Sequence, residues 1–193
     1  MRAWSRTQPT PILIMPDGRA TTAFRRSWLS RAHLEMSLIV EPREKGMNVI
    51  VGRLQDLPFD SMARLVAESE QTGWMFLRRL LDEWAAGTNR FDKPGEAIFA
   101  AWATGKLIGV CGLNVDPYIG DGRIGRVRHL YVLSDFRRLG VGRRLVEAVV
   151  AAARGQFVSL RLRTESAEAA EFYEELGFQR WSEMSDCTHV REI

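Results

Sequence analysis

Two hydrophobic periods alternate along most of the chain and predict the order of its helices and strands. Residues 60–70 repeat apolar side chains every three or four positions, at Met62, Leu65 and Val66, which is the spacing of one face of an amphipathic helix. Residues 157–163 alternate apolar and polar side chains, which is the spacing of a strand with one buried face. The predicted elements are, in order, a strand at residues 49–51, helices at 60–70 and 74–85, strands at 98–103, 107–113 and 125–133, a helix at 143–153, a strand at 157–163, a helix that ends at 176, and strands at 178–181 and 188–192. This order predicts an α/β fold.

Length and composition fit one folded domain that carries an extra segment. The chain has 193 residues, of which 46% are apolar, and this is enough to bury a core. Its longest candidate for a membrane span, residues 97–103, is far shorter than the roughly 18 apolar residues that a membrane helix needs. We therefore expect a soluble protein with no membrane partner.

The cysteines and histidines do not indicate a disulfide framework or a metal site. Cys111 and Cys187 do not form a Cys-x-x-Cys pair, and the three histidines are not at the spacing of metal ligands. We expect no metal cofactor and, because a reducing compartment is the default for such a chain, a cytoplasmic location.

Positive charge is concentrated in two places. Residues 1–46 contain eight Lys or Arg and four Asp or Glu. Residues 47–193 contain 19 Lys or Arg and 20 Asp or Glu, so this part of the chain is close to neutral. Residues 120–144 nevertheless contain seven arginines and two aspartates. A positive field confined to one stretch suits a small polyanion better than a long duplex. We expect no nucleic-acid partner, and a nucleic-acid binder that uses these arginines is the weaker alternative.

Residues 1–46 form a separate segment whose role the sequence does not reveal. Prolines near its start are turn signals, and a mixed helical stretch follows at residues 22–40. Three interpretations stay open: an extension that packs on the domain, an organelle transit peptide, which the arginines favour, or a segment that precedes a true start at Met47. We divide the chain into this extension and a domain at residues 47–193.

A glycine loop joins the predicted strand that ends at Leu133 to the helical run that begins at Arg143. Its sequence is Arg137-Arg138-Leu139-Gly140-Val141-Gly142. The first N–H groups of a helix have no intrahelical partner and together carry about half a positive charge, so a helix start binds anions. Glycines let an anion approach the backbone, and guanidinium groups bind phosphate oxygens in pairs. The loop therefore predicts a pyrophosphate site.

Two motifs of the chain resemble those of one enzyme family. The glycine loop matches R/Q-x-x-G-x-G/A, and the segment Ala169-Ala170-Glu171-Phe172-Tyr173-Glu174-Glu175-Leu176-Gly177-Phe178 matches A-x-x-F-Y-x-x-L-G-F, in the usual order and at the usual separation. The pair resembles the GNAT superfamily, the acyl-CoA-dependent N-acyltransferases. The resemblance covers about residues 47–193 and implies the GNAT fold, a mixed, mostly antiparallel twisted sheet that is flanked by helices and has splayed central strands.

The resemblance implies acetyl-CoA as co-substrate and assigns residues to it. The strand at residues 130–132 would offer backbone groups to the pantetheine arm and a donor to the thioester oxygen, because a bulge splays it from the strand near residues 158–163. The predicted cofactor-binding residues are Leu130, Tyr131, Val132, Arg137, Arg138, Leu139, Gly140, Val141, Gly142, Arg143 and Phe172.

Tyr173 is the predicted general acid. It matches the position where the family commonly places a tyrosine that protonates the leaving thiolate, and its ordinary pKa near 10 is above that of a thiol. The alternative is an aromatic side chain that packs on the sheet beside Phe172 and Phe178.

The general base is harder to assign, because the family often places a glutamate where this chain has Arg126. His129 is the predicted base or substrate contact, since its ordinary pKa is near 6.5, and a structural histidine is the alternative. Glu165 and Asp116 are weaker candidates for the base. Candidates for lining the acceptor pocket are Trp74, Trp84 and Tyr118, and core packing is the alternative for the two tryptophans.

Together, these expectations describe an N-acetyltransferase that transfers an acetyl group from acetyl-CoA to a primary amine, which attacks directly in one ternary complex. A non-catalytic acyl-CoA-binding sensor or complex subunit is the alternative, suggested by the missing strand glutamate. The acceptor is a small-molecule or peptide amine, and an antibiotic, a polyamine, an amino acid or a protein N-terminus are all compatible. Pairing of two copies is common in the family, which leaves a homodimer open.

Overall fold

The computed structural model describes residues 48–193, and the predicted extension at residues 1–46, together with Met47, lies outside the described residues. The strands are β1 (Val49–Arg53), β2 (Ala97–Ala103), β3 (Lys106–Val115), β4 (Ile124–Val132), β5 (Ser159–Leu162), β6 (Gln179–Arg180) and β7 (His189–Glu192). The helices are α1 (Phe59–Gln71), α2 (Phe76–Ala85), α3 (Val141–Ala153) and α4 (Ala167–Glu175), with a short 3₁₀ turn, η1, at Ser134–Phe136. The predicted element order is confirmed.

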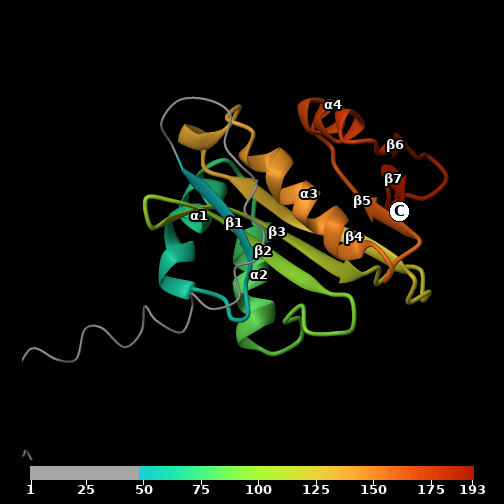
Figure 1. The fold of residues 1–193 in the computed structure, drawn as a ribbon, viewed down its shortest axis with the longest axis horizontal. Helices are drawn as coiled ribbons and strands as arrows, with labels where there is room; N and C mark the ends of the chain where they lie inside the picture. The colour runs from blue at the N-terminus through green and yellow to red at the C-terminus, as the bar shows by residue number, and fades with distance from the viewer. Residues whose placement is uncertain (1–47) are drawn as a thin grey trace, which may run out of the picture. The chain divides into compact units, whose positions relative to one another are not determined.

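The strands form one mixed sheet in the order β1-β2-β3-β4-β5-β7-β6 (Figure 1). All neighbours pair antiparallel except β4 and β5, which run parallel. That parallel pairing covers only Ile124–Arg126 against Ser159–Arg161, while β4 continues to Val132. The central strands therefore separate beyond Arg126, as the predicted fold requires.

A bulge in β4 lies just beyond this point of separation. Gly112 of β3 pairs with Arg128, and Val110 pairs with Tyr131, so two residues of β4 lie opposite Cys111 alone. The first of these two residues, His129, has φ 57°, in the left-handed region that side chains other than Gly, Asn and Asp rarely adopt. The bulge thus interrupts the regular pairing where the predicted pantetheine strand begins.

Helices cover both faces of the sheet. The side chain of Tyr131 contacts α1 and α2 through Glu68 and Phe76, whereas the side chain of the next residue, Val132, lies near Gly142 of α3. Since successive strand residues point to opposite faces, α1 and α2 lie on one face and α3 on the other. Within residues 48–193, no helix is long and apolar enough to cross a membrane.

The helices form because their apolar faces are buried against the sheet. The most completely buried large side chains of the helices are Met62 and Leu65 of α1, Leu77 and Leu80 of α2, and Leu145 of α3. Each such side chain contributes roughly 1.5–3 kcal/mol by leaving water. This packing fixes α3, and with it the glycine loop, against β2, β3 and β4.

The hairpin between β2 and β3 shows how local sequence determines a turn. Thr104 and Gly105 both have positive φ angles, 48° and 76°, which is the geometry of a two-residue turn that matches the twist of the strands. The prediction of a hairpin at this point is therefore confirmed.

Candidate active site

The N-terminus of α3 is open to an anion. The helix has no side-chain cap, and Arg144 is the first residue whose N–H reaches a carbonyl of the same turn, that of Gly140 at 3.1 Å. The N–H groups of residues 141–143 have no hydrogen-bond acceptor within the described part of the chain. Gly140 has φ 76°, and a Cβ placed on it would meet no atom of residues 48–193 within 4 Å apart from its chain neighbours. Free N–H groups next to open space fit a diphosphate.

Gly142 serves a different purpose from Gly140. A Cβ placed on it would lie 3.4 Å from Cζ of Phe172. This is ordinary van der Waals contact, so the Phe172 ring of α4 packs directly beside the start of α3. Phe172 is thus beside the open helix terminus, and its role in cofactor binding stays a prediction.

Two arginines of the glycine loop, Arg137 and Arg138, and Arg143 in the first turn of α3 differ in what they contact. Arg137 is half-exposed and lies against the end of β4, where its Nε donates to the Val132 carbonyl at 2.8 Å and its guanidinium lies 5.2 Å from the centre of the Tyr131 ring. Arg138 and Arg143, whose side chains are 85% and 45% exposed, lie 3.4 and 3.2 Å from glutamates of α4. Exposed pairs of this kind contribute at most about 1 kcal/mol, so both guanidinium groups remain available to an incoming anion.

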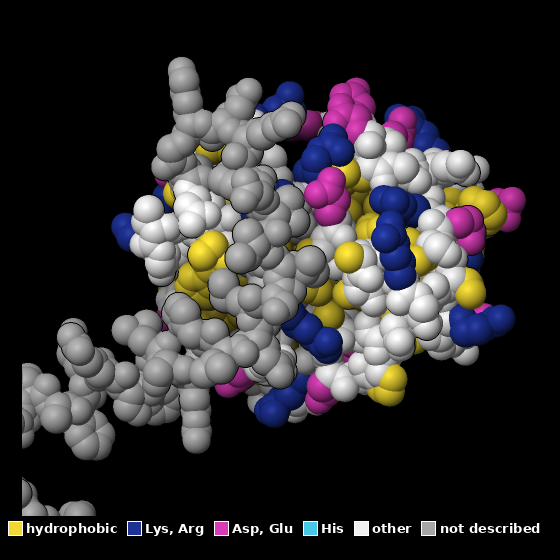
Figure 2. All heavy atoms as spheres, in the orientation of Figure 1, with side chains coloured by type: hydrophobic (Ala, Val, Ile, Leu, Met, Phe, Trp, Pro, Cys, Tyr) yellow, Lys and Arg dark blue, Asp and Glu magenta, His cyan; other side chains and the backbone are white. Residues whose placement is uncertain are grey.

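Figure 2 shows one face of the molecule. On the part of this face that the described residues form, the Lys and Arg side chains are dispersed, with acidic side chains between them. This part of the face has no continuous positive track of the kind that binding of a long nucleic acid needs.

Tyr173 lies inside the protein at the junction of α4 with the sheet. Its ring makes edge contacts with the rings of Phe172 and Phe178, at centroid distances of 5.2 and 5.6 Å. Burial, and to a lesser degree the nearby Cys111 thiol, raises the pKa of Tyr173 above its ordinary value. Cys111 is the β3 residue opposite the β4 bulge. Tyr173 is therefore protonated at neutral pH and lies close to the region where the central strands separate.

His129 is buried on the α2 side of the sheet. Its ring lies 6.3 Å from the ring of Phe76 and 6.0 Å from that of Phe91, and both ring nitrogens lack a partner among the described residues. Burial, followed by the charges of Arg128 and Arg79, lowers the pKa of His129 to about 3. A side chain with this pKa holds a proton only in acid, so its role as a base stays a prediction that the geometry does not favour.

Acidification is expected to destabilise the protein through His129. In the unfolded chain the pKa of His129 is near 6.5. Between about pH 6.5 and pH 3 the unfolded state therefore binds a proton at His129 that the folded state does not bind. The free energy of unfolding should fall by up to about 1.4 kcal/mol per pH unit in this window. We expect His129→Asn to show a flatter pH dependence than the wild type in urea unfolding at pH 7, 5 and 4. Parallel curves for the two proteins would contradict this account of His129.

Arg126, at the position where the family often has a glutamate, belongs to a buried ion cluster. Its guanidinium lies 3.1 Å from Asp116 and 3.6 Å from Asp186, and it also donates to the Asp186 carbonyl. The Tyr118 ring lies over it at 4.6 Å. Asp116, a weaker candidate for the base, is thus fully buried in an ion pair. The other weak candidate, Glu165, is exposed and pairs with a neighbouring arginine.

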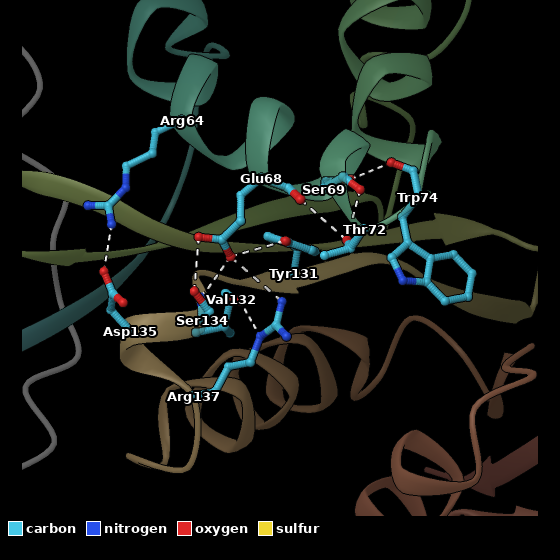
Figure 3. Close-up of polar contacts among 10 residues, drawn as sticks. All are labelled: Arg64, Glu68, Ser69, Thr72, Trp74, Tyr131, Val132, Ser134, Asp135 and Arg137. Atoms are coloured by element: carbon cyan, nitrogen blue, oxygen red, sulfur yellow. Dashed lines mark hydrogen bonds and ion pairs between the residues drawn. The ribbon is translucent and has the colours of Figure 1, made fainter.

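The aromatic candidates for the acceptor pocket separate into two groups. Trp84 is buried and donates from its indole to Asp56, so it belongs to the core. Trp74 and Tyr118 are 48% and 63% exposed and so are free to contact a second substrate. Trp74 follows α1, and Figure 3 shows its indole projecting away from the Glu68 carboxylate.

Glu68 of α1 is a residue that the sequence analysis missed. Its carboxylate accepts hydrogen bonds from the Tyr131 hydroxyl at 3.1 Å and from the Ser134 N–H at 2.7 Å, and lies 3.8 Å from the Arg137 guanidinium (Figure 3). Burial and this carboxylate raise the pKa of Tyr131. The only signal in the sequence is that Glu68 lies one helical turn after Leu65, at the edge of the apolar face of α1.

A shallow pocket of about 400 Å³ lies away from the glycine loop, between the start of α4 and strands β6 and β7. Thr164, Ser166, Trp181 and His189 are among the residues that line it. The open terminus of α3 is therefore a separate feature.

Comparison with known proteins agrees with this architecture. Residues 59–178 match the model of the acetyltransferase (GNAT) family. A protein of Exiguobacterium sp. 255-15, described as an acetyltransferase, is 33% identical, with a TM-score of 0.67 over 76% of this chain and 94% of that chain. The PaiA N-acetyltransferase of Thermoplasma acidophilum, solved in complex with coenzyme A, is 17% identical, with a TM-score of 0.58 over 76% of this chain and 100% of that chain. An acetyltransferase of Streptococcus agalactiae 2603 is 16% identical, with a TM-score of 0.61 over 75% of this chain and 98% of that chain.

The fold and the family model define an acyltransferase of mixed α/β architecture. The chain belongs to the GNAT acetyltransferase family.

Proposed function

We propose that this protein is an N-acetyltransferase that transfers an acetyl group from acetyl-CoA to a primary amine, which attacks directly in a ternary complex. The observation that carries the proposal is the uncapped N-terminus of α3, whose first N–H groups have no acceptor among residues 48–193, together with the separation of β4 from β5. We assign the activity to residues 47–193 and no role to residues 1–46.

Residues of this chain would hold the cofactor at two places. The N–H groups of residues 141–143 and the exposed Arg138 and Arg143 bind the diphosphate. The edge of β4 at residues 130–132, which has no pairing with β5, offers backbone groups to the pantetheine arm. Acetyl-CoA, when bound, supplies the activated acetyl group as a thioester.

Two proton transfers accompany the reaction. Tyr173 donates the proton that the departing thiolate takes up. Its raised pKa keeps the hydroxyl protonated at neutral pH and also makes it a weaker acid than an exposed tyrosine. The attacking amine gives its proton to a second group. His129 stays the predicted acceptor of that proton, and the low pKa of its ring makes this the weaker of the two assignments.

The experiment that tests the proposal is an acetylation assay with a panel of amines. The purified protein is incubated with acetyl-CoA and a polyamine, an amino acid, an aminoglycoside or a peptide with a free N-terminus, and free thiol and acetylated product are both measured. We expect one amine class to raise thiol release at least about tenfold above hydrolysis, with one acetyl group added to the amine.

A second candidate function is a non-catalytic acyl-CoA sensor. It is favoured by the ion-paired Arg126, which occupies the position of the strand glutamate, and by the low pKa of His129. Coenzyme A binding without turnover on any amine of the panel would support the sensor and contradict the transferase.

A further inference from the structure

Three parts of the molecule that lie far apart in sequence meet at the Glu68 side chain. Glu68 belongs to α1, Tyr131 to the end of β4, and Ser134 begins the η1 turn that leads into the glycine loop. The Glu68 carboxylate uses both oxygens: Oε1 accepts from the Tyr131 hydroxyl and the Ser134 N–H, and Oε2 accepts from the Ser134 hydroxyl at 3.1 Å. One side chain thus fixes the place where β4 turns into the loop.

The Glu68 carboxylate also contacts the Arg137 side chain. The guanidinium of Arg137 lies 3.8 Å from the carboxylate, over the Tyr131 ring, and its Nε donates to the Val132 carbonyl. The Glu68 side chain is 20% exposed and that of Arg137 is 48% exposed, so water screens this pair on the arginine side and less on the carboxylate side. The contact holds the first residue of the glycine loop against the end of β4.

A neighbouring ion pair provides a natural comparison. Arg64, one turn earlier on α1, lies 2.7 Å from Asp135 of η1, so it joins the same two elements (Figure 3). The side chains of Arg64 and Asp135 are 53% and 68% exposed. Among the interactions of the described residues, this ion pair has no contact with β4 or with the glycine loop. The connection through Arg64 is therefore a surface pair, whereas that through Glu68 also contacts the end of β4 and Arg137.

We propose that Glu68 is a positioning residue for the cofactor site. Its carboxylate holds Ser134 and Arg137 in place. The end of β4 and the start of α3 are thereby kept in the geometry that receives the diphosphate and pantetheine of acetyl-CoA. The inference rests on the proposed function and adds a residue on α1 that acts through β4 and the loop. In this proposal Glu68 acts on the cofactor through Ser134 and Arg137.

Replacing Glu68 with Ala is expected to raise the Kd for coenzyme A about tenfold, because it removes several hydrogen bonds to a charged group at once. KM for acetyl-CoA should rise in parallel, while kcat stays within about threefold of the wild type. The matched control is Arg64→Ala, which should leave the Kd within about twofold. Isothermal titration calorimetry with coenzyme A measures the Kd, and circular dichroism verifies that each variant is folded.

Two further variants separate positioning from a general loss of structure. Glu68→Gln retains an oxygen that accepts from Ser134 and Tyr131, so its Kd should return to within about threefold of the wild type. In an Arg137→Ala background, Glu68→Ala should weaken binding by less than about threefold, because the two residues act through one network.

The outcomes distinguish this inference from the proposed function. A folded Glu68→Ala variant that binds coenzyme A as tightly as the wild type would overturn the positioning role, and so would a full tenfold effect in the Arg137→Ala background. A wild-type protein that does not bind coenzyme A at all would instead overturn the proposed function.

Discussion

Replacing Tyr173 with Phe is expected to lower kcat by about 10²- to 10⁴-fold, the range that a positioned general acid contributes. The ring and its edge contacts with Phe172 and Phe178 stay in place, so only the proton donor is lost. The Kd for coenzyme A should therefore stay within about twofold of the wild type, as measured by calorimetry beside steady-state kinetics.

Phe178→Leu is the matched control for packing around Tyr173. It removes the aromatic edge contact and keeps the hydroxyl, so it should lower the free energy of unfolding by about 1 kcal/mol and kcat by less than about tenfold. If Tyr173→Phe instead reduced affinity and turnover equally, Tyr173 would be a packing residue and the general acid would lie elsewhere.

Replacing Gly140 with Leu should weaken coenzyme A binding by more than about hundredfold, because the side chain would fill the space in front of the free N–H groups of α3. The substitution also forces a non-glycine residue to φ 76°, which costs about 1–2 kcal/mol. Binding is measured by calorimetry with coenzyme A.

Gly155 provides a control with the same local geometry. It has φ 75°, follows the other end of α3, and a Cβ on it would also meet no atom within 4 Å among the described residues that are not its chain neighbours. Gly155→Leu should therefore lose a similar amount of stability and retain wild-type affinity. Equal affinity for both variants would remove the diphosphate site from the start of α3.

Local sequence patterns were sufficient to predict the elements of this fold. The helical period at Met62, Leu65 and Val66 and the Thr104-Gly105 turn signal each depend on residues close in the chain, and both predictions are confirmed. The separation of β4 from β5 was implied by the family resemblance, and the register confirms it. Strand ends were less predictable: β5 is shorter than the alternating pattern at residues 157–163, because only Ser159–Leu162 have paired neighbours.

The surroundings of the site residues could not be predicted, because they depend on contacts between distant parts of the chain. His129 is enclosed partly by Phe91, from the segment between the helix predicted at residues 74–85 and the strand predicted at residues 98–103, and Gly112 lacks the Cβ that would collide with that ring. Glu68 and Tyr131 are 63 positions apart, and no motif links them. The sequence therefore indicated candidate residues for the chemistry, but not which of them are buried or paired.

The central claim is that the start of α3 binds the diphosphate of coenzyme A, and a crystal structure of the complex tests it most directly. The account predicts the diphosphate within hydrogen-bonding distance of the N–H groups of residues 141–143, with the pantetheine arm along the unpaired edge of β4. Coenzyme A bound instead in the pocket between α4, β6 and β7, with the start of α3 facing solvent, would contradict it.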